Sequence, residues 1–149
     1  MLKSKPKFID IHSHVNFKAF DEDREAVIAR ALENDTWVIN VGTQVDTSKK
    51  AIEIAHQYNE GVYAIIGLHP NHSEIFNKDF YRKLEKSGKV VGIGECGLDY
   101  FRSPDDDSKR KQESAFRAQI ELSIELDLPL MLHIRSAYRE AVAILSEYP

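Results

Sequence analysis

Short apolar segments alternate along the whole chain with longer segments in which apolar residues recur every three or four positions. The short segments lie at 7–15, 36–42, 62–68, 90–95 and 128–134. Those around Val38 and Val91 are apolar on both faces, which is typical of buried parallel strands. This alternation predicts an α/β fold with a parallel sheet covered by helices. No linker or repeat interrupts it, so we expect five βα units in a single domain, residues 1–149.

Five helices are expected between and after these strands. Apolar residues at helical spacing place the first at 21–34 and the second at 47–58, with Asp46 as its N-cap. The fifth, at 137–148, is expected to run to the chain end. The acidic run 105–107 is interpreted as the start of the fourth helix, because carboxylates there favour the helix dipole. The third and fourth helices are marked by Phe76, Phe80 and Leu84 and by Phe116, Ile120 and Ile124.

Composition limits the classes of protein to which the chain can belong. With 149 residues, 42% apolar and 30% charged, it can bury one sizeable core. Cys96 is the only cysteine, which excludes an internal disulfide and favours a reducing, cytoplasmic location. No apolar run is long enough for a membrane span or a signal peptide, so no membrane association is expected. The net charge of -4 argues against a broad basic surface for nucleic acid, so phosphate must be bound at a local site.

The first strand carries the pattern His12-Ser13-His14 at its end. Residues two apart on a strand point to the same face, so the two imidazoles can hold one metal ion. Ile9 and Ile11 are expected to point the other way, toward the cover of the sheet. A single His-x-His pair is, however, more often a hydrogen-bonded structural pair than a pair of ligands.

Further polar residues follow the ends of other expected strands, and in parallel α/β folds this end of the sheet forms the site. Each alone has an ordinary structural explanation: a loop position for His69, a salt bridge to Arg135 for Glu95, a core histidine for His133. Arg135 is placed equally well to clamp a phosphate oxygen or to pair with Glu95 or Asp99. The residues of this group are His69, Glu95, His133 and Arg135.

Taken together, the strand-end residues predict a metal site. Neutral imidazoles with a carboxylate suit Zn²⁺ or Mn²⁺, whereas Mg²⁺ prefers more oxygen ligands. A carboxylate flanked by two histidine groups, as Glu95 is here, can bridge two ions. Two neighbouring ions can activate a water molecule and take up charge on a phosphoryl transition state.

Four motifs, in this order and spacing, resemble those of the TatD family of metal-dependent deoxyribonucleases, and the resemblance covers nearly the whole chain. Gln112 and Phe116 also match that family's pattern before the fifth strand. The motifs are Ile9-Asp10-Ile11-His12-Ser13-His14, Gly67-Leu68-His69-Pro70, Gly94-Glu95-Cys96-Gly97-Leu98-Asp99-Tyr100 and Leu128-Pro129-Leu130-Met131-Leu132-His133-Ile134-Arg135.

The resemblance implies a partial (β/α)8 TIM barrel of the amidohydrolase type with two divalent ions, Zn, Mn or Mg. His12 and His14 would hold one ion, and Glu95 would bridge to the second, held by His133. His69 and Arg135 would contact the substrate phosphate, which makes Glu95 and His69 the expected catalytic residues. The implied activity is hydrolysis of phosphodiester bonds in DNA, with exonucleolytic cleavage.

The chain is shorter than the family's barrel, which takes about 250 residues. The resemblance implies two more ligands, a histidine after a sixth strand and an aspartate after an eighth, and the sequence contains neither. We therefore expect the N-terminal portion of such a barrel, with an incomplete active site that needs the missing C-terminal portion or self-association. Two alternatives stay open: an inactive truncated relative acting as a binding or assembly module, and another amidohydrolase or phosphoesterase.

Overall fold

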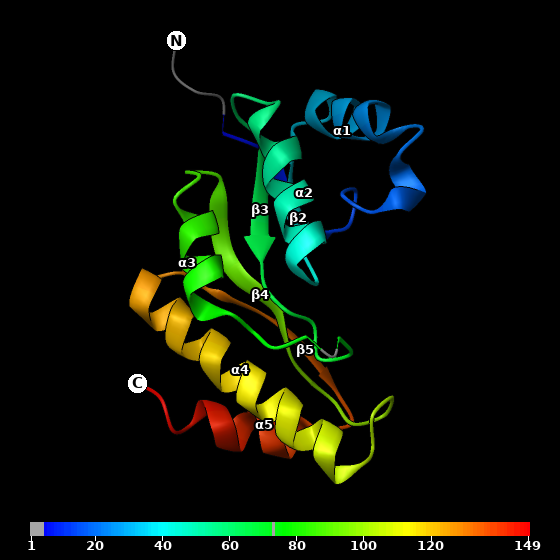
Figure 1. Cartoon of the computed structure of the whole chain (residues 1–149). Coiled ribbons are helices and arrows are strands. Elements are labelled where there is room, and N and C mark those ends of the chain that lie inside the picture. The colour runs from blue at the N-terminus through cyan, green and yellow to red at the C-terminus, as the bar shows by residue number, and fades with distance from the viewer. Residues whose placement is uncertain (1–4, 73) are drawn as a thin grey trace.

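The computed structural model describes residues 5–72 and 74–149 and contains a five-stranded parallel sheet in the order β1-β2-β3-β4-β5. The strands are β1 (Phe8–Ser13), β2 (Thr36–Val41), β3 (Val62–Ile66), β4 (Val90–Asp99) and β5 (Leu130–Arg135). The helices are α1 (Arg24–Glu33), α2 (Val45–His56), α3 (Lys78–Glu85), α4 (Asp106–Leu126) and α5 (Tyr138–Leu145), with a short 3-10 helix, η1 (Lys18–Phe20). Each of the first four strands is followed by a helix and then by the next strand of the sheet, and α5 follows β5, as in a partial (β/α) barrel (Figure 1).

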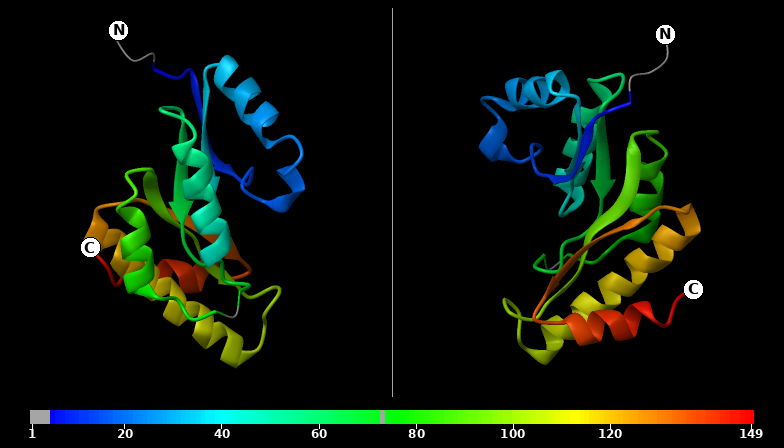
Figure 2. Two further views of the ribbon diagram at one scale, coloured as in Figure 1. Left: turned by 45° about the horizontal axis from the view of Figure 1, so that its top comes forward. Right: turned by 180° about the vertical axis from the view of Figure 1, so that it is seen from behind.

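The sheet curls, and the helices pack against its outer face (Figure 2). Apolar residues that alternate along the strands face these helices and form the core, because burying them removes apolar surface from water. On β3 these are Val62, Ala64 and Ile66, each 0% exposed. They pack against residues of α1, α2, α3 and α4, such as Ile28, Ala51, Tyr81 and Leu122. The predicted α/β architecture with five βα units is confirmed.

Three boundaries differ from the sequence prediction. β4 extends to Asp99, so Glu95 lies inside the strand and not at its end, because the chain beyond it stays paired with β5 through Asp99 and Arg135. Asp46 is not the N-cap of α2. The helix begins earlier, at Val45, after Gln44, whose backbone N–H donates to the Thr47 hydroxyl at 3.1 Å. α5 ends at Leu145, before the end of the chain.

The outer side of β1 is not covered as the sequence suggested. Ile9 and Ile11 are 51% and 58% exposed, and none of the described helices lies over them. The reason is that α1 packs against β2 through Ile28 and Val38 and leaves β1 as an open edge. The acidic run before α4 is a helix start as predicted, since the Asp105 carboxylate accepts a hydrogen bond from Ser108 N–H at 2.8 Å.

Two strands contain irregularities where polar side chains reach the inner face. The β4·β5 register passes from Gly94 directly to Cys96, so Glu95 has no register partner on β5. The β1·β2 register shifts in the same way between Asp10 and Ser13. Such bulges re-aim a side chain and are common beside functional sites. Within the described part of the chain, no helix is both long enough and apolar enough to cross a membrane.

Candidate metal centre

Glu95 lies at the centre of a polar cluster on the inner face of the sheet. Its backbone N–H donates to the carbonyl of Gly42 at 3.1 Å, which fixes β4 against the end of β2. Glu95 is only 7% exposed. A carboxylate buried to this extent is costly unless it is hydrogen-bonded or paired.

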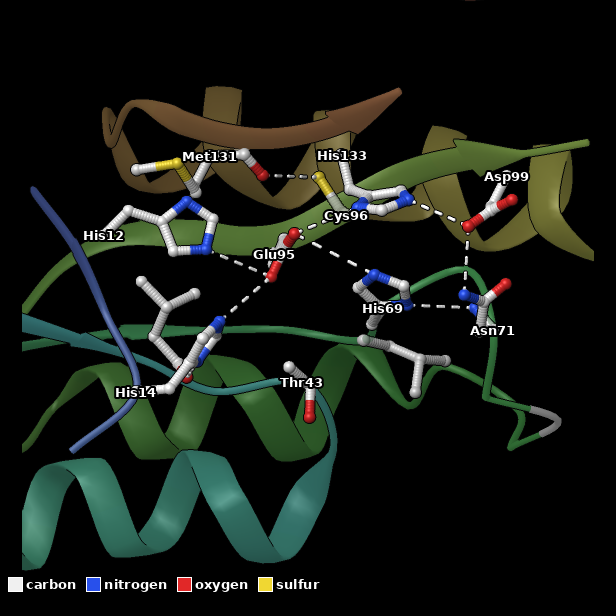
Figure 3. A network of polar contacts seen from close by, with 12 residues as sticks. His12, His14, Thr43, His69, Asn71, Glu95, Cys96, Asp99, Met131 and His133 are labelled. Carbon is white, nitrogen blue, oxygen red and sulfur yellow. Dashed lines mark hydrogen bonds and ion pairs between the residues drawn. The ribbon is translucent and has the colours of Figure 1, made fainter. Parts of the chain in front are cut away.

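The two carboxylate oxygens of Glu95 face two different groups of imidazoles (Figure 3). Oε2 lies 3.2 Å from Nε2 of His12 and 3.6 Å from Nε2 of His14. Oε1 lies 3.1 Å from Nδ1 of His133 and 3.9 Å from Nε2 of His69. The structure thus brings together all four histidines that the sequence singled out with Glu95.

The ring of His14 is fixed from behind. Its Nδ1 lies 3.0 Å from the carbonyl oxygen of Val41, so this nitrogen must carry the proton and donate. Nε2 is then unprotonated and turned toward Glu95, as a metal ligand requires. Asn16 donates to the same carbonyl at 3.2 Å, and the ring of Phe17 stacks on His14 with the centroids 4.5 Å apart.

The ring of His133 is held by Asp99. Nε2 of His133 lies 3.0 Å from Oδ2 of Asp99, which leaves Nδ1 facing Glu95. Burial alone would raise the pKa of Asp99, but hydrogen bonds from Arg102 N–H, the Asn71 amide and His133 hold it below its usual range. Asp99 is therefore a carboxylate, and a carboxylate behind a histidine orients the ring and raises its basicity as a ligand.

His69 differs from the other three histidines. Its Nδ1 accepts a hydrogen bond from the backbone N–H of Asn71 at 3.1 Å, so the proton of the neutral ring is on Nε2. Burial, together with the neighbouring His133, lowers the pKa of His69 to about 4. Near neutral pH, His69 is thus an uncharged donor whose N–H points into the cluster.

Arg135 does not pair with Glu95 or with Asp99, so this alternative is wrong. Its guanidinium lies over the ring of Phe101, with Cζ 4.0 Å from the ring centroid. The reason is that Asp99 is already occupied by His133 and Asn71, and Glu95 by the histidines.

The sequence did not identify the residues that hold the cluster in place. The sequence places Asp99 in a family motif and offers it as a partner for Arg135, but it does not predict the contact of Asp99 with His133. Gln112, known only from the family pattern, accepts from Asp99 N–H at 2.7 Å and donates to its carbonyl at 3.3 Å. The signal available in the sequence was a second acidic residue, Asp99, four positions after Glu95.

The described residues contain two groups of ligand atoms that fit divalent ions. The atoms of His12, His14 and Glu95 all lie within 4.8 Å of one another, and so do those of His69, Glu95 and His133. Both groups share Glu95 and combine imidazole nitrogen with carboxylate oxygen, the donor set of Zn²⁺ and related ions. In the second group Nε2 of His69 carries a proton, which leaves His133 and Glu95 as the ligands. The fixed tautomer of His14 and the Asp99–His133 pair match the outer-shell support that metal ligands usually have.

A cavity of about 520 Å³ opens beside this cluster, between the loop after β3 and α4. It touches the cluster only through His69 and continues past His72 toward Arg110 and Lys111. Both of these cations are turned toward Asp107, at 3.6 and 2.7 Å.

Comparisons with known proteins point in one direction. A family model described as TatD related DNase matches residues 9–149. The 3′-5′ ssDNA/RNA exonuclease TatD of Pantoea ananatis is 35% identical over 143 residues, which are 93% of this chain and 54% of that protein. An uncharacterized metal-dependent hydrolase of Bacillus subtilis, YabD, is 38% identical over 144 residues, with the same two coverages.

Solved structures agree with the sequence comparisons. YjjV, a TatD homologue from Escherichia coli, superposes with a TM-score of 0.79 and 32% identity, over 94% of this chain and 55% of that one. A TatD family hydrolase from Entamoeba histolytica also gives a TM-score of 0.79, with 28% identity over 95% and 54% of the two chains. The chain spans about half the length of these relatives. Because the match covers nearly all of this chain and includes the clustered histidines and Glu95, the chain belongs to the family of TatD-related DNases.

Proposed function

We propose that this chain supplies the two-metal centre of a hydrolase that cleaves phosphodiester bonds in nucleic acid. The observation that carries the proposal is the position of Glu95, whose two oxygens face two separate groups of imidazoles. A carboxylate in this position can bridge two ions, with one ion on each side. A structural salt bridge would need only one cationic partner.

The residues of the cluster divide into ligands and substrate-binding groups. We assign His12 and His14 to one ion, His133 to the other, and Glu95 to both. When bound, the ions supply activation of water and neutralisation of charge on the phosphate. Asp99 is a positioning residue that keeps Nδ1 of His133 turned toward Glu95.

His69 and Arg135 are assigned to the substrate phosphate. His69 presents an uncharged N–H donor at the edge of the cluster, which can donate to a phosphate oxygen of the substrate. The guanidinium of Arg135 lies over the ring of Phe101, and an arginine so placed can still direct N–H groups at a phosphate.

The substrate class follows from the relatives. Several of them are named 3′-5′ ssDNA/RNA exonucleases, which supports single-stranded DNA as the first substrate to test and exonucleolytic cleavage as the mode. We further propose that residues 1–149 act as one domain, the N-terminal part of a closed barrel. A cytoplasmic location is supported by the single, buried Cys96.

Glu95→Gln tests the proposal, because it keeps the shape of the side chain but removes its charge. Isothermal titration of the chain with Mn²⁺ and Zn²⁺ should show two molar equivalents in the wild type, and loss of both in the variant. Glu53→Gln, an exposed glutamate on α2, is the matched control and should bind as the wild type does.

Cleavage is measured on 3′-labelled single-stranded DNA with and without metal. It is followed for this chain and for the chain fused to the remaining segment of the Pantoea ananatis relative. We expect metal-dependent cleavage by the fused protein and at least a 100-fold loss on Glu95→Gln, on the order of removing one group that stabilises transition-state charge. Undiminished cleavage by Glu95→Gln would show that Glu95 is not the bridging ligand.

A further inference from the structure

Phe101 is a large apolar side chain left exposed beside the metal centre. It is 63% exposed and lies two residues beyond the end of β4. The guanidinium of Arg135 covers part of its ring at 4.0 Å, a cation–π contact, and Arg135 is itself exposed. Together the two side chains present adjoining cationic and aromatic groups to solvent.

The Phe101–Arg135 stack is built on the same strands as the metal centre. Asp99 and Arg135 are register partners in the β4·β5 ladder, and Tyr100 N–H donates to the Arg135 carbonyl at 3.0 Å. Arg135 follows His133 by two residues and shares its face. The rise of a strand then separates the backbone of Arg135 from that of His133 by about 7 Å along β5.

The course of the backbone directly after Arg135 is also fixed. Ser136, the next residue, has a φ of 55°, a left-handed conformation that non-glycine residues adopt rarely. The chain therefore turns sharply at Ser136 and enters α5 two residues later. The short segment that begins at Arg135 is therefore held by β5 on one side and by α5 on the other.

A second exposed cation–π pair, Lys7 and Phe8, serves as a comparison for Arg135 and Phe101. Lys7 lies over Phe8 at 5.4 Å, and Phe8 is 58% exposed, but this pair is at the opposite end of the sheet. Among the described residues, Arg135 has no carboxylate within ion-pair distance. Its N–H groups are therefore left for another anion, such as a phosphate.

We propose that Phe101 and Arg135 form a stacking platform for a nucleobase of single-stranded nucleic acid, next to the phosphate held at the metal centre. This inference rests on the proposed function and adds to it the way in which the substrate strand is held. Aromatic rings and guanidinium planes bind unpaired bases by stacking, and every base offers a π face. The platform therefore favours a single strand over a duplex, without selecting a sequence.

The test compares binding of a base with binding of the backbone alone. Two phosphorothioate single-stranded oligonucleotides, which resist hydrolysis, are titrated in Mn²⁺: one has 2-aminopurine near its 3′ end, the other an abasic residue there. On the wild type, 2-aminopurine fluorescence should be quenched on binding, as stacking requires. Phe101→Ala should raise the Kd of the base-containing strand about 5- to 100-fold, the usual effect of losing one base–aromatic stack. It should leave the Kd of the abasic strand unchanged.

Three further variants separate stacking from general apolar contact. Phe101→Leu keeps the apolar volume and should weaken binding nearly as much as Phe101→Ala, whereas Phe101→Trp should retain binding and quenching. Phe8→Ala removes the matched stack at the other end of the sheet and should bind as the wild type does. Because Phe101 is mostly exposed, circular dichroism melts of its variants should overlay that of the wild type.

The outcomes distinguish the platform from the proposed function. Equal loss on the base-containing and abasic strands, no loss on either, or no binding by the wild type would each overturn the platform. Base-dependent binding that persists when Glu95→Gln leaves cleavage undiminished would support the platform and contradict the proposed bridging role of Glu95. Cleavage that is lost in Glu95→Gln, together with equal binding of the base-containing and abasic strands, would support the bridging role of Glu95 and contradict the platform.

Discussion

Glu95 is a buried carboxylate whose side-chain partners are imidazoles and not a lysine or arginine. Its nearest side-chain partners are Nε2 of His12 at 3.2 Å and Nδ1 of His133 at 3.1 Å. In the absence of metal, Nε2 of His12 can donate to the carboxylate, whereas Nδ1 of His133 can do so only when both nitrogens of that ring are protonated, because Nε2 faces Asp99. Metal binding needs the same nitrogens unprotonated, so ligand and proton compete at each of them, and metal affinity must depend on pH.

Asp99→Asn tests the support behind His133. The variant keeps the size of the side chain but loses the charge, and its amide can donate where the carboxylate could only accept. Nε2 of His133 then loses the partner that fixes its proton, and we expect metal affinity to fall about 10- to 100-fold. Titration calorimetry with Zn²⁺ measures the change. Asp127→Asn is a suitable control, since asparagine tolerates the left-handed φ of 53° found there; equal affinities in both variants would contradict the role of Asp99.

At the scale of elements, the sequence predicted the strands and helices because their periodicity reflects which faces are buried. Val62, Ala64 and Ile66 alternate as a strand that faces helices must. The polar strand-end residues were equally visible, since His69 and His133 interrupt apolar surroundings. The irregularities that aim Glu95 and His12 were not visible, because register shifts depend on pairing with a neighbouring strand, which no local pattern reveals.

The support of the site was hidden for the same reason. Asp99 and Gln112 are thirteen residues apart and meet only because α4 folds back along β4. The N-cap of α2 was misplaced because Asp46 and Gln44 both precede apolar residues at helical spacing. Pairing between the Gln44 N–H and the Thr47 hydroxyl decides the start, and composition alone does not show it.

Gly97→Ala tests the close approach of β4 to β5. Gly97 has a φ of 139°, and a Cβ there would lie 2.2 Å from the carbonyl oxygen of His133. The variant must either strain β4 or push His133 away, so we expect a loss of unfolding free energy of at least about 1–3 kcal/mol and weaker metal binding. Urea denaturation and metal titration measure the two effects.

Gly88→Ala separates backbone strain from the collision at Gly97. Gly88 also has a positive φ, 75°, but a Cβ there meets nothing within 4 Å. This substitution should cost about 1–2 kcal/mol through its backbone alone and leave metal affinity unchanged. If Gly97→Ala is no more damaging than Gly88→Ala, the contact with the His133 carbonyl is unimportant.

At the scale of the whole molecule, the sheet is an open arc whose ligands come from its two edges. His12 and His14 belong to the end of β1, whereas His133 belongs to β5, and Glu95 lies between them on β4. The outermost strands are not hydrogen-bonded to each other in the five-stranded sheet. Ions bound on both sides of Glu95 would therefore connect the first strand to the last across the inner face.

Metal should consequently stabilise the whole fold and not only its site. A ligand that binds only the folded state at 100 times its Kd adds about 2.7 kcal/mol. For a chain of this length that corresponds to a rise of about 5–10 °C in Tm. Differential scanning fluorimetry with increasing Zn²⁺ measures the rise, and EDTA should reverse it. Binding of Zn²⁺ to the unfolded chain would make the rise in Tm smaller, but the rise would still depend on the residues that bind the metal in the folded chain.

Two histidine variants test whether the rise in Tm comes from the metal centre. His14→Ala removes one of the two ligands contributed by the β1 edge and should reduce the rise, because His12 alone would then hold the ion to that edge. His56→Ala removes an exposed histidine of α2, outside the cluster, and should leave the rise intact. Equal rises in the two variants would mean that Zn²⁺ stabilises the chain elsewhere. A rise reduced only in His14→Ala would show that the metal connects β1 to the strands on the other side of the arc.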